Sequence, residues 1–340
     1  MSTRVSVIIP LYNKASTVRQ AIRSVVTQSV RAAEVVVVDD GSTDGGGAEV
    51  VGLGIANLRL ITQTNAGVSA ARNRGMKEAG HDVVAFLDAD DQWGPNFLEA
   101  ISHLIELYPE AGVFATNYLR HFVDGMSRGR CLPGFRAYNT WEGLLNRYCE
   151  IAGNQGSPIH SSAIAVRRSV LEEIGGFPAG VIFGEDLITW VRLALSSQIA
   201  YTSRPCAIYN VRSPHHSTST LLSLRRVADE LYGMFCENPW ELRSVACLIQ
   251  RQYYGLALLH LERGDAESAK QCLARGTEVA PAHSRSQLAA TIARAPGTGG
   301  RVFAALLRRV REVRDRIKSE ELSHVLQELR WTAADGGSGH

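Results

Sequence analysis

The chain has 340 residues, of which 45% are hydrophobic and 21% are charged, and its formal net charge at pH 7 is +2. This composition is typical of a globular protein with room for about two domains, and it excludes wholesale disorder. Because the net charge is close to zero, the protein has no overall positive potential that would attract a nucleic acid, and we expect no nucleic-acid partner. Neither a signal peptide nor a run of about 18 apolar residues is visible, so we predict no transmembrane span.

The six cysteines are too scattered to form a metal or redox motif. They include no C-x-x-C pair, and no group of them has the spacing of zinc ligands. We therefore expect reduced thiols and a cytoplasmic location.

Apolar runs and helical patterns alternate through the N-terminal part of the chain. Buried strands, rich in valine, isoleucine and leucine, are predicted at 5–10, 34–40, 58–62 and 82–88. One helix should run from a capping box of Thr17 and Gln20 to about residue 28, and another should span 67–80 and close at Gly80. This alternation predicts an α/β fold with a mostly parallel, doubly wound sheet flanked by helices.

Distinctive side chains follow these strands at the point where each one ends. In doubly wound sheets, ligands bind beyond the carboxyl ends of the strands, so these side chains are expected to line one crevice. They are Pro10, which should stop the first strand, and Tyr12 just after it, Asp39 and Asp40 after the second strand, and Asp88, Asp90 and Asp91 after the fourth.

The densest of these groups is the acidic end of the stretch VVAFLDADDQW, residues 83–93. Carboxylates crowded beside an apolar core repel one another and protonate unless a cation holds them ionised. Strand alternation predicts that Asp88 and Asp90 lean the same way, while Asp91 points oppositely or begins the turn. Carboxylates without a thiolate suit Mg²⁺ or Mn²⁺. The alternative is that these acids cap a helix beginning at Pro95.

The predicted crevice lacks the common phosphate-binding loops. No G-x-x-x-x-G-K-[ST] motif occurs, and no G-x-G-x-x-G follows the first strand. We therefore expect neither a P-loop ATPase nor a dinucleotide enzyme. Acids at two strand ends instead favour carboxylate hydrogen bonds to a base or ribose, with a metal ion meeting the phosphates.

Five stretches occur in a characteristic order: VSVIIPLYNKASTVRQAIRSVVTQS, VVVVDDGSTDG, TNAGVSAARNRGMKEAG, VVAFLDADDQW and GEDLITWVRLAL. Together they resemble the successive motifs of the family 2 glycosyltransferases over roughly residues 4–220. The resemblance implies a GT-A fold, a nucleotide-sugar donor, a divalent metal ion and transfer of the sugar with inversion.

The resemblance also implies roles for the matching residues. Donor binding would fall to Pro10, Tyr12, Asp39, Asp40, Asn65, Gly67, Arg72, Asp88 and Asp90. Asp40 would accept a hydrogen bond from a uracil-type base, and Arg72 would either reach the phosphates or brace the acids. The metal ligands would be Asp90, Asp91 and His216, the last preferred over His215.

The acids of the GEDLITW stretch resemble the family's E-D motif, in which the aspartate is the catalytic base. An acceptor hydroxyl is a poor nucleophile at neutral pH, so a carboxylate must take its proton as it attacks. The resemblance assigns this role to Asp186 and acceptor binding to Glu185. Both acids also suit the first turn of a helix, whose dipole we expect to lower the pKa of Asp186.

Beyond about residue 220 the resemblance ends and helical patterns dominate. We expect a catalytic domain at 1–220, a helical extension at 221–295 with one tetratricopeptide-like hairpin, a basic amphipathic helix at 301–331 and a disordered tail at 332–340. The basic helix would lie on an anionic membrane or dock on protein. The stretch QELRW fits a motif of processive synthases but lacks their membrane spans, so we expect transfer of a single sugar.

The sequence thus predicts an inverting glycosyltransferase with a UDP-type donor and Mn²⁺ or Mg²⁺. Its acceptor would be a glycan or lipid-linked molecule of the cell envelope, met in the cytoplasm or at the cytoplasmic face of the membrane. Two alternatives stay open. A sugar-phosphate nucleotidyltransferase would share the sheet and the metal, although PLYNKAST lacks the glycine-rich first loop of that class. A non-catalytic scaffold would act through the helical tail.

Overall fold

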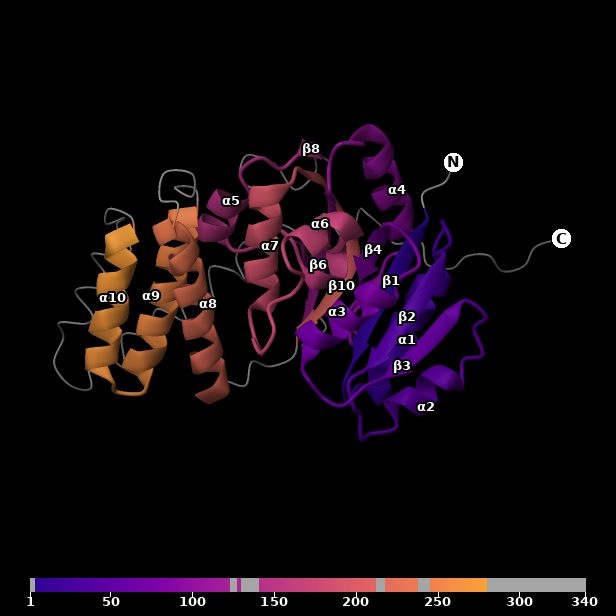
Figure 1. Cartoon of the computed structure of the whole chain (residues 1–340), viewed down its shortest axis with the longest axis horizontal. Helices are drawn as coiled ribbons and strands as arrows, with labels where there is room; N and C mark the ends of the chain where they lie inside the picture. The colour runs from indigo at the N-terminus through magenta and orange to yellow at the C-terminus, as the bar shows by residue number, and fades with distance from the viewer. Residues whose placement is uncertain (1–3, 123–126, 130–140, 212–217, 238–244, 280–340) are drawn as a thin grey trace.

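A computed structural model describes residues 4–122, 127–129, 141–211, 218–237 and 245–279 (Figure 1). Its centre is a 10-stranded sheet with the order β3-β2-β1-β4-β9-β6-β10-β5, to which β7 adds beside β6 and β8 beside β10. The strands are β1 (Val5–Leu11), β2 (Glu34–Asp39), β3 (Leu58–Thr62), β4 (Val83–Phe86), β5 (Gln92–Trp93), β6 (Val113–Phe122), β7 (Ser127–Gly129), β8 (Glu142–Leu144), β9 (Ile164–Arg167) and β10 (Ile199–Val211). The predicted α/β class is confirmed.

The sheet is mixed, and the direction of β9 matters for the site. Strands β3, β2, β1 and β4 are parallel, as the alternating sequence predicts, and β6 is parallel to β10. Strand β9 runs antiparallel between β4 and β6, so Ile164 at its start pairs with Phe86 at the end of β4. The loop that enters β9 therefore lies at the edge where the acids of VVAFLDADDQW emerge.

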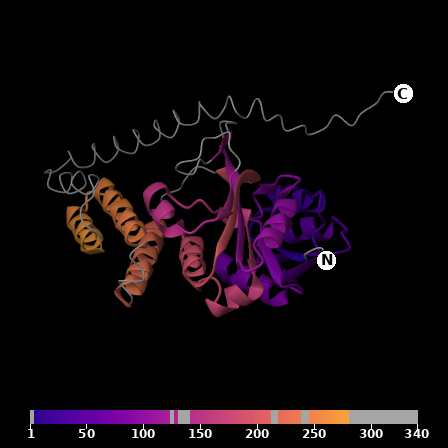
Figure 2. The ribbon, with the colours of Figure 1, turned by 90° about the horizontal axis from the view of Figure 1, so that it is seen from above.

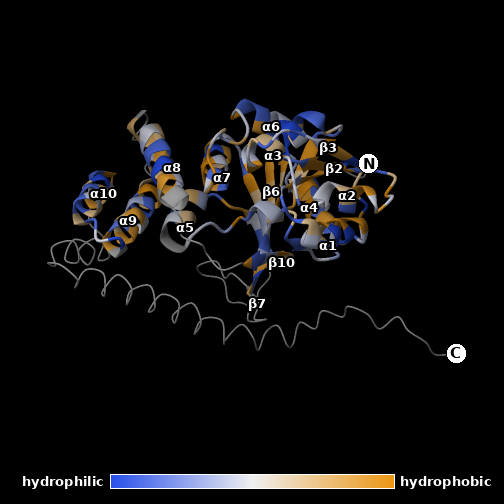
Figure 3. Cartoon of the chain, turned by 90° about the horizontal axis from the view of Figure 1, so that it is seen from below, coloured by the Kyte–Doolittle hydropathy of each residue, from blue (hydrophilic) through white to orange (hydrophobic). Residues whose placement is uncertain are grey.

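Helices cover both faces of the sheet (Figure 2). They are α1 (Ala15–Val26), α2 (Gly46–Val51), α3 (Val68–Glu78), α4 (Phe97–Leu107), α5 (Tyr148–Gln155), α6 (Arg168–Glu173), α7 (Glu185–Ser196), α8 (Thr218–Glu237), α9 (Ala246–Glu262), α10 (Ala266–Val279) and the 3-10 helix η1 (Ser161–Ala163). Alternate residues of β1 enter opposite cores: Ile9 packs with α1 and α4, whereas Ile8 packs with α3 and α7. Figure 3 shows β2 and β6 largely in the hydrophobic colour, as expected for strands buried on both faces, whereas β10 is partly in the hydrophilic colour.

The C-terminal helices extend the core on the α7 side of the sheet. Helices α9 and α10 form a packed pair joined by a short turn, and α9 also packs on α5 and α8. The approach of α5 to α9 is close: a Cβ added to Gly153 would lie 2.7 Å from the backbone nitrogen of Leu248. The tetratricopeptide comparison and the domain boundaries stay predictions, and the helix expected at 301–331 lies outside the described residues. Among the described helices, none is long and apolar enough to cross a membrane.

Several predicted element ends differ from the structure. Strand β2 ends at Asp39, and helix α3 ends at Glu78, before the predicted stop at Gly80. Helix α1 begins at Ala15, and the Thr17 hydroxyl donates to the carbonyl of Lys14, so Thr17 lies inside the first turn and does not cap it. Strand β1 continues through Pro10 to Leu11, since a proline is tolerated where no ladder donor is required. Strand β4 already ends at Phe86, so the acids that follow lie in a turn.

Candidate active site

The edge formed by the ends of β1 and β2 carries the residues predicted to bind the nucleotide. Tyr12 is 48% exposed there, whereas Asp40 is buried. The Asp40 carboxylate accepts hydrogen bonds from the backbone N–H groups of Ala66 at 2.9 Å and Gly67 at 2.8 Å, and from the Gln63 amide at 2.8 Å. These bonds fix the loop before α3, which also contains the exposed Asn65. Asp40 therefore shapes this edge whether or not it meets a ligand.

The other predicted residues of this edge support the same backbone. Asp39 is buried, and its Oδ1 accepts a hydrogen bond from the Ser42 N–H at 2.9 Å. Pro10 is buried inside β1 in register with Val38 of β2. Gly67 precedes α3 with a φ of 90°, a conformation that strains other residues. Their contacts with a donor stay predictions.

The acids after β4 lie in a tight turn, which changes the arrangement expected from strand alternation. The backbone N–H of Asp91 donates to the carbonyl of Asp88 at 3.0 Å. This turn brings the carboxylates of Asp88 and Asp91 together, while Asp90 contacts the ammonium group of Lys14. Asp91 is buried and accepts hydrogen bonds from the Ser162 hydroxyl at 2.5 Å and the backbone N–H of Asn210 at 2.9 Å.

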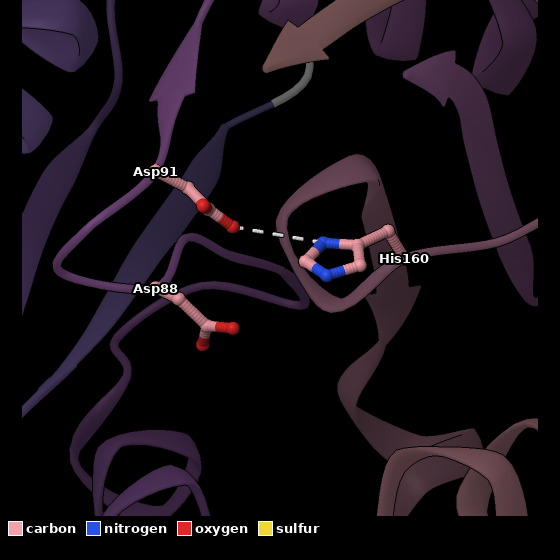
Figure 4. Close-up of side chains that lie close together, drawn as sticks. All are labelled: Asp88, Asp91 and His160. Atoms are coloured by element: carbon pink, nitrogen blue, oxygen red, sulfur yellow. Dashed lines mark ion pairs between the residues drawn. The ribbon is translucent and has the colours of Figure 1, made fainter. Parts of the chain in front are cut away.

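His160 completes this group from the loop before β9 (Figure 4). Ligand atoms of Asp88, Asp91 and His160 lie within 4.8 Å of one another. The imidazole stacks on Tyr209 with ring centroids 4.2 Å apart, and its Nδ1 accepts a hydrogen bond from the Ser162 N–H at 3.2 Å. The stacking on Tyr209 and the hydrogen bond from Ser162 therefore hold the ring in place.

The environment gives the members of the cluster different protonation states. Burial lowers the pKa of His160 to about 4, so the ring is neutral at neutral pH and its 3.7 Å approach to Asp91 is then no ion pair. Burial, together with the charge of Asp88, raises the pKa of Asp91 well above its usual value. Burial is the largest influence on the pKa of Asp88 and acts to raise it, but the charge and hydrogen bond of Arg72 together with the other nearby positive charges outweigh burial, so the net shift is downward.

This donor set fits a divalent metal ion. Two carboxylates and a neutral imidazole are ligands that Mn²⁺ and Mg²⁺ sites use, and the ion would relieve the repulsion between Asp88 and Asp91. Asp90 and Asp91 stay predicted ligands, and His216 lies outside the described residues. His160 was missed in the sequence because nothing near it has metal-ligand spacing. His160 reaches the acids because β9 runs antiparallel to β4 and β6, and the alternation of strands and helices in the sequence predicts parallel strands.

Arg72 of α3 connects the turn after β4 to the start of α7. Its two terminal nitrogens contact Asp88 at 2.8 Å and Glu185 at 2.7 Å. The guanidinium lies 5.1 Å from the ring centre of Phe177, and the side chain is 3% exposed. Of the two roles predicted for Arg72, bracing the acids is the one that these contacts show.

A second clamp beside Arg72 fixes the loop that leads to α7. The Asn73 side chain accepts from the Phe177 N–H at 2.9 Å and donates to the Phe177 carbonyl at 2.8 Å. Both bonds join Asn73, which follows Arg72 in the chain, to Phe177, on whose ring Arg72 packs. The ARN stretch therefore positions the N-terminus of α7 against the acid cluster.

The acids at the start of α7 have distinct environments. Glu185 is buried and paired with Arg72. Asp186 is half-buried, and its Oδ1 accepts a hydrogen bond from the Leu187 N–H at 2.7 Å. Burial and the negative charge of Glu185 raise the pKa of Asp186 to about 7. The expectation that the helix N-terminus lowers this pKa is wrong, because burial outweighs the favourable contacts.

A pocket of about 350 Å³ adjoins the acids on the α1 side. Its lining is polar and includes amides, a hydroxyl and an imidazole beside the two carboxylates. The lining residues are Thr17, Gln20, Asp90, Asp91, Gln92, His121 and Asn210. The acid turn therefore has open space beside it.

Comparison with known proteins shows what this arrangement resembles. Residues 6–175 match the family described as Glycosyl transferase family 2. The uncharacterized glycosyltransferase YibD of Escherichia coli is 41% identical over 102 residues, which are 29% of this chain and 30% of YibD. An uncharacterized glycosyltransferase of Nostoc sp. is 33% identical over 174 residues, covering 50% of this chain and 53% of the relative.

A solved structure shares the fold. Residues 1–349 of S. aureus TarS in complex with UDP-GlcNAc superpose with a TM-score of 0.63 at 20% identity, over 84% of each chain. The molecule described above is therefore an α/β protein with a GT-A fold. Because the family match spans half of its length, the chain belongs to glycosyltransferase family 2. Its matched segments span about half or less of YibD and the Nostoc protein.

Proposed function

We propose that the chain is an inverting glycosyltransferase that moves one sugar from a UDP-type nucleotide sugar to an acceptor hydroxyl. The observation that carries this proposal is the position of Arg72, which contacts Asp88 at 2.8 Å and Glu185 at 2.7 Å. This guanidinium brings the acids that would face the leaving diphosphate next to the helix that bears the predicted base. A glycosyltransferase needs a base beside the acceptor hydroxyl and positive charge beside the donor's leaving diphosphate, on opposite sides of the same reacting carbon.

The donor would lie along the edge from β2 to the acid turn. Tyr12, Asp40, Asn65 and Gly67 would meet the nucleoside, since all four lie at the ends of β1 and β2 or at the start of α3. Asp88, Asp91 and His160 would hold the metal ion, with Asp90 beside them. When bound, Mn²⁺ or Mg²⁺ would supply positive charge against the negative charge that grows on the leaving diphosphate.

Asp186 would act as the general base. It would take the proton of the acceptor hydroxyl while that oxygen attacks C1 of the donor sugar from the face opposite the nucleoside diphosphate. The new bond joins C1 to the acceptor oxygen, the bond from C1 to the phosphate oxygen breaks, and the proton ends on Asp186. A pKa of about 7 suits this role, because a base works best when its pKa is near the working pH.

The acceptor is proposed as a glycan or lipid-linked molecule of the cell envelope. What supports this is the basic amphipathic pattern at 301–331, which would let the protein approach an anionic membrane surface. The location would be the cytoplasm or the cytoplasmic face of the membrane.

The proposal is tested with a panel of UDP-, GDP- and TDP-linked sugars. Each would be incubated with the full chain and Mn²⁺, Mg²⁺ or EDTA, and release of nucleoside diphosphate would be measured with and without candidate acceptors. We expect metal-dependent release from one or a few UDP-sugars. Release of pyrophosphate from UTP and a sugar 1-phosphate would instead indicate a nucleotidyltransferase. Absence of both reactions and of donor binding would favour the scaffold.

A further inference from the structure

Lys14 is a cation at the crevice for which the proposed chemistry has no role. It precedes α1 as the N-cap residue, and its ammonium group contacts Oδ2 of Asp90. We propose that Lys14 is a positioning residue. Its ammonium group would hold Asp90 in the metal-free protein and would move to the donor's diphosphate when metal and donor bind. This inference rests on the proposed function, since it requires both a divalent ion and a nucleoside diphosphate at the crevice.

The backbone around Lys14 is fixed, so its side chain starts from a defined point. Asn13 has a φ of 50°, and its N–H donates to the Ser42 hydroxyl at 3.1 Å, while its side-chain oxygen accepts from the Thr43 N–H at 2.8 Å. On the other side, the Ala15 N–H donates to the Asp44 carboxylate at 2.8 Å. These bonds tie the residues that flank Lys14 to the loop after β2.

The Lys14 side chain, in contrast, can exchange its partner. Its side chain is 29% exposed and that of Asp90 is 21% exposed, whereas the side chain of Arg72 on the neighbouring Asp88 is 3% exposed. A partly exposed pair between a flexible lysine and a carboxylate contributes little to stability and is readily replaced. A buried guanidinium with two carboxylate partners, such as that of Arg72, is not readily replaced. Arg72 is thus a fixed cation at the acid turn, whereas Lys14 is an exchangeable one.

Electrostatics link this exchange to the ligands. An ammonium group on Asp90 repels a divalent ion that approaches the neighbouring acids, and it occupies an oxygen that could bind that ion. A diphosphate that arrives with the ion offers the ammonium group a new anionic partner. The pocket beside Asp90, which has Thr17 of the first turn of α1 in its wall, adjoins the carboxylate that the ammonium group would leave. Metal and nucleotide should therefore favour each other's binding through Lys14, by the same factor in both directions.

The test uses Lys14→Met, which keeps the length of the side chain and removes its charge. Binding of MnCl₂ alone, and of UDP with and without MnCl₂, would be measured by titration calorimetry on the full chain. We expect Lys14→Met to bind Mn²⁺ alone about tenfold more tightly and UDP in the presence of Mn²⁺ about tenfold more weakly, because the charge that repels the ion and attracts the diphosphate is removed. The gain in Mn²⁺ affinity that UDP produces should shrink accordingly, and Lys14→Arg should keep most of that gain.

Lys77→Met serves as the matched control, because Lys77 is exposed at the end of α3. It should behave as the unmodified chain in every titration. Unchanged Mn²⁺ and UDP affinities in Lys14→Met would overturn the inference, and so would weaker Mn²⁺ binding in the absence of UDP. Failure of the unmodified chain to bind both Mn²⁺ and UDP would instead overturn the proposed function itself, and the inference with it.

Discussion

Asp88 in the turn after β4 and Asp186 at the start of α7 both lie near Arg72, yet their environments shift the pKa values of these two carboxyl groups in opposite directions. At the turn, Arg72 and the other nearby cations outweigh burial and lower the pKa of Asp88. At the helix, burial and the charge of Glu185 outweigh Arg72 and raise the pKa of Asp186 to about 7. One carboxylate is therefore kept ionised at neutral pH, and the other is able to take up a proton.

The contrast shows how a single arginine can serve two kinds of acid. Arg72 contacts Asp88 and Glu185 directly but reaches Asp186 only through space. Groups whose environments separate their pKa values are candidates for different roles in one reaction. Here Asp88 would bind the metal ion and Asp186 would remove a proton from the acceptor. Substitutions at Asp186, Arg72 and His160 test whether these roles belong to the residues named.

The largest effect is expected for Asp186→Asn. Loss of a general base lowers turnover by roughly 100-fold to 10,000-fold, while the acid turn that would hold the metal and diphosphate is unchanged. Steady-state kinetics with the preferred donor, together with calorimetry of UDP and Mn²⁺, separates the two quantities. Asp82→Asn, an exposed acid before β4, is the control and should leave both unchanged. Unchanged turnover in Asp186→Asn would show that Asp186 is not the general base.

Arg72→Met should be the next most damaging change. It leaves two largely buried carboxylates without their shared cation, which is expected to cost about 3 kcal/mol of unfolding free energy. Urea denaturation measures this loss. Arg74→Met removes an arginine of the same helix that is 51% exposed, so less than about 1 kcal/mol should be lost. Equal losses in the two variants would show that Arg72 does not connect the two regions.

His160→Gln tests the proposed metal site at the turn after β4. Glutamine retains much of the bulk but removes the imidazole nitrogen, so Mn²⁺ affinity in the presence of UDP should fall by at least about tenfold. Calorimetry or the spin-resonance signal of free Mn²⁺ reports this affinity. His103→Gln, a histidine that is 56% exposed, is the matched control. Unaltered affinity in His160→Gln would exclude the ring as a ligand.

The pH dependence of turnover probes the base side. Asp186 must be deprotonated to act, so kcat should rise about tenfold per pH unit below its pKa of about 7 and level off above it. Asp88→Asn should move this limb slightly toward lower pH, because the negative charge of Asp88 helps to raise the pKa of Asp186. A flat profile between pH 5 and 8, where the chemical step limits turnover, would contradict the assignment.

The parts of the fold that depend on local pattern could be predicted from the sequence. The apolar runs of β1, β2 and β4 and the acids near their ends could be placed, because alternation of strands and helices and the position of charge are local properties. Strand β3 was expected to be buried, but it lies at the edge of the sheet and none of its residues is fully buried. The antiparallel β9 was not predicted, because strand direction depends on long-range pairing that no motif records. His160 was missed for the same reason, and the pKa of Asp186 was misjudged because burial of a helix terminus cannot be seen in its sequence.

The central claim is that Asp88, Asp91 and His160 hold a divalent ion beside a nucleoside diphosphate. Anomalous diffraction from crystals of the chain grown with MnCl₂ and UDP tests it most directly. The account predicts a manganese peak within coordination distance of these three side chains, with the diphosphate of UDP on the open side of the ion. Bound UDP without manganese at this position, or manganese bound elsewhere in the crevice, would contradict it.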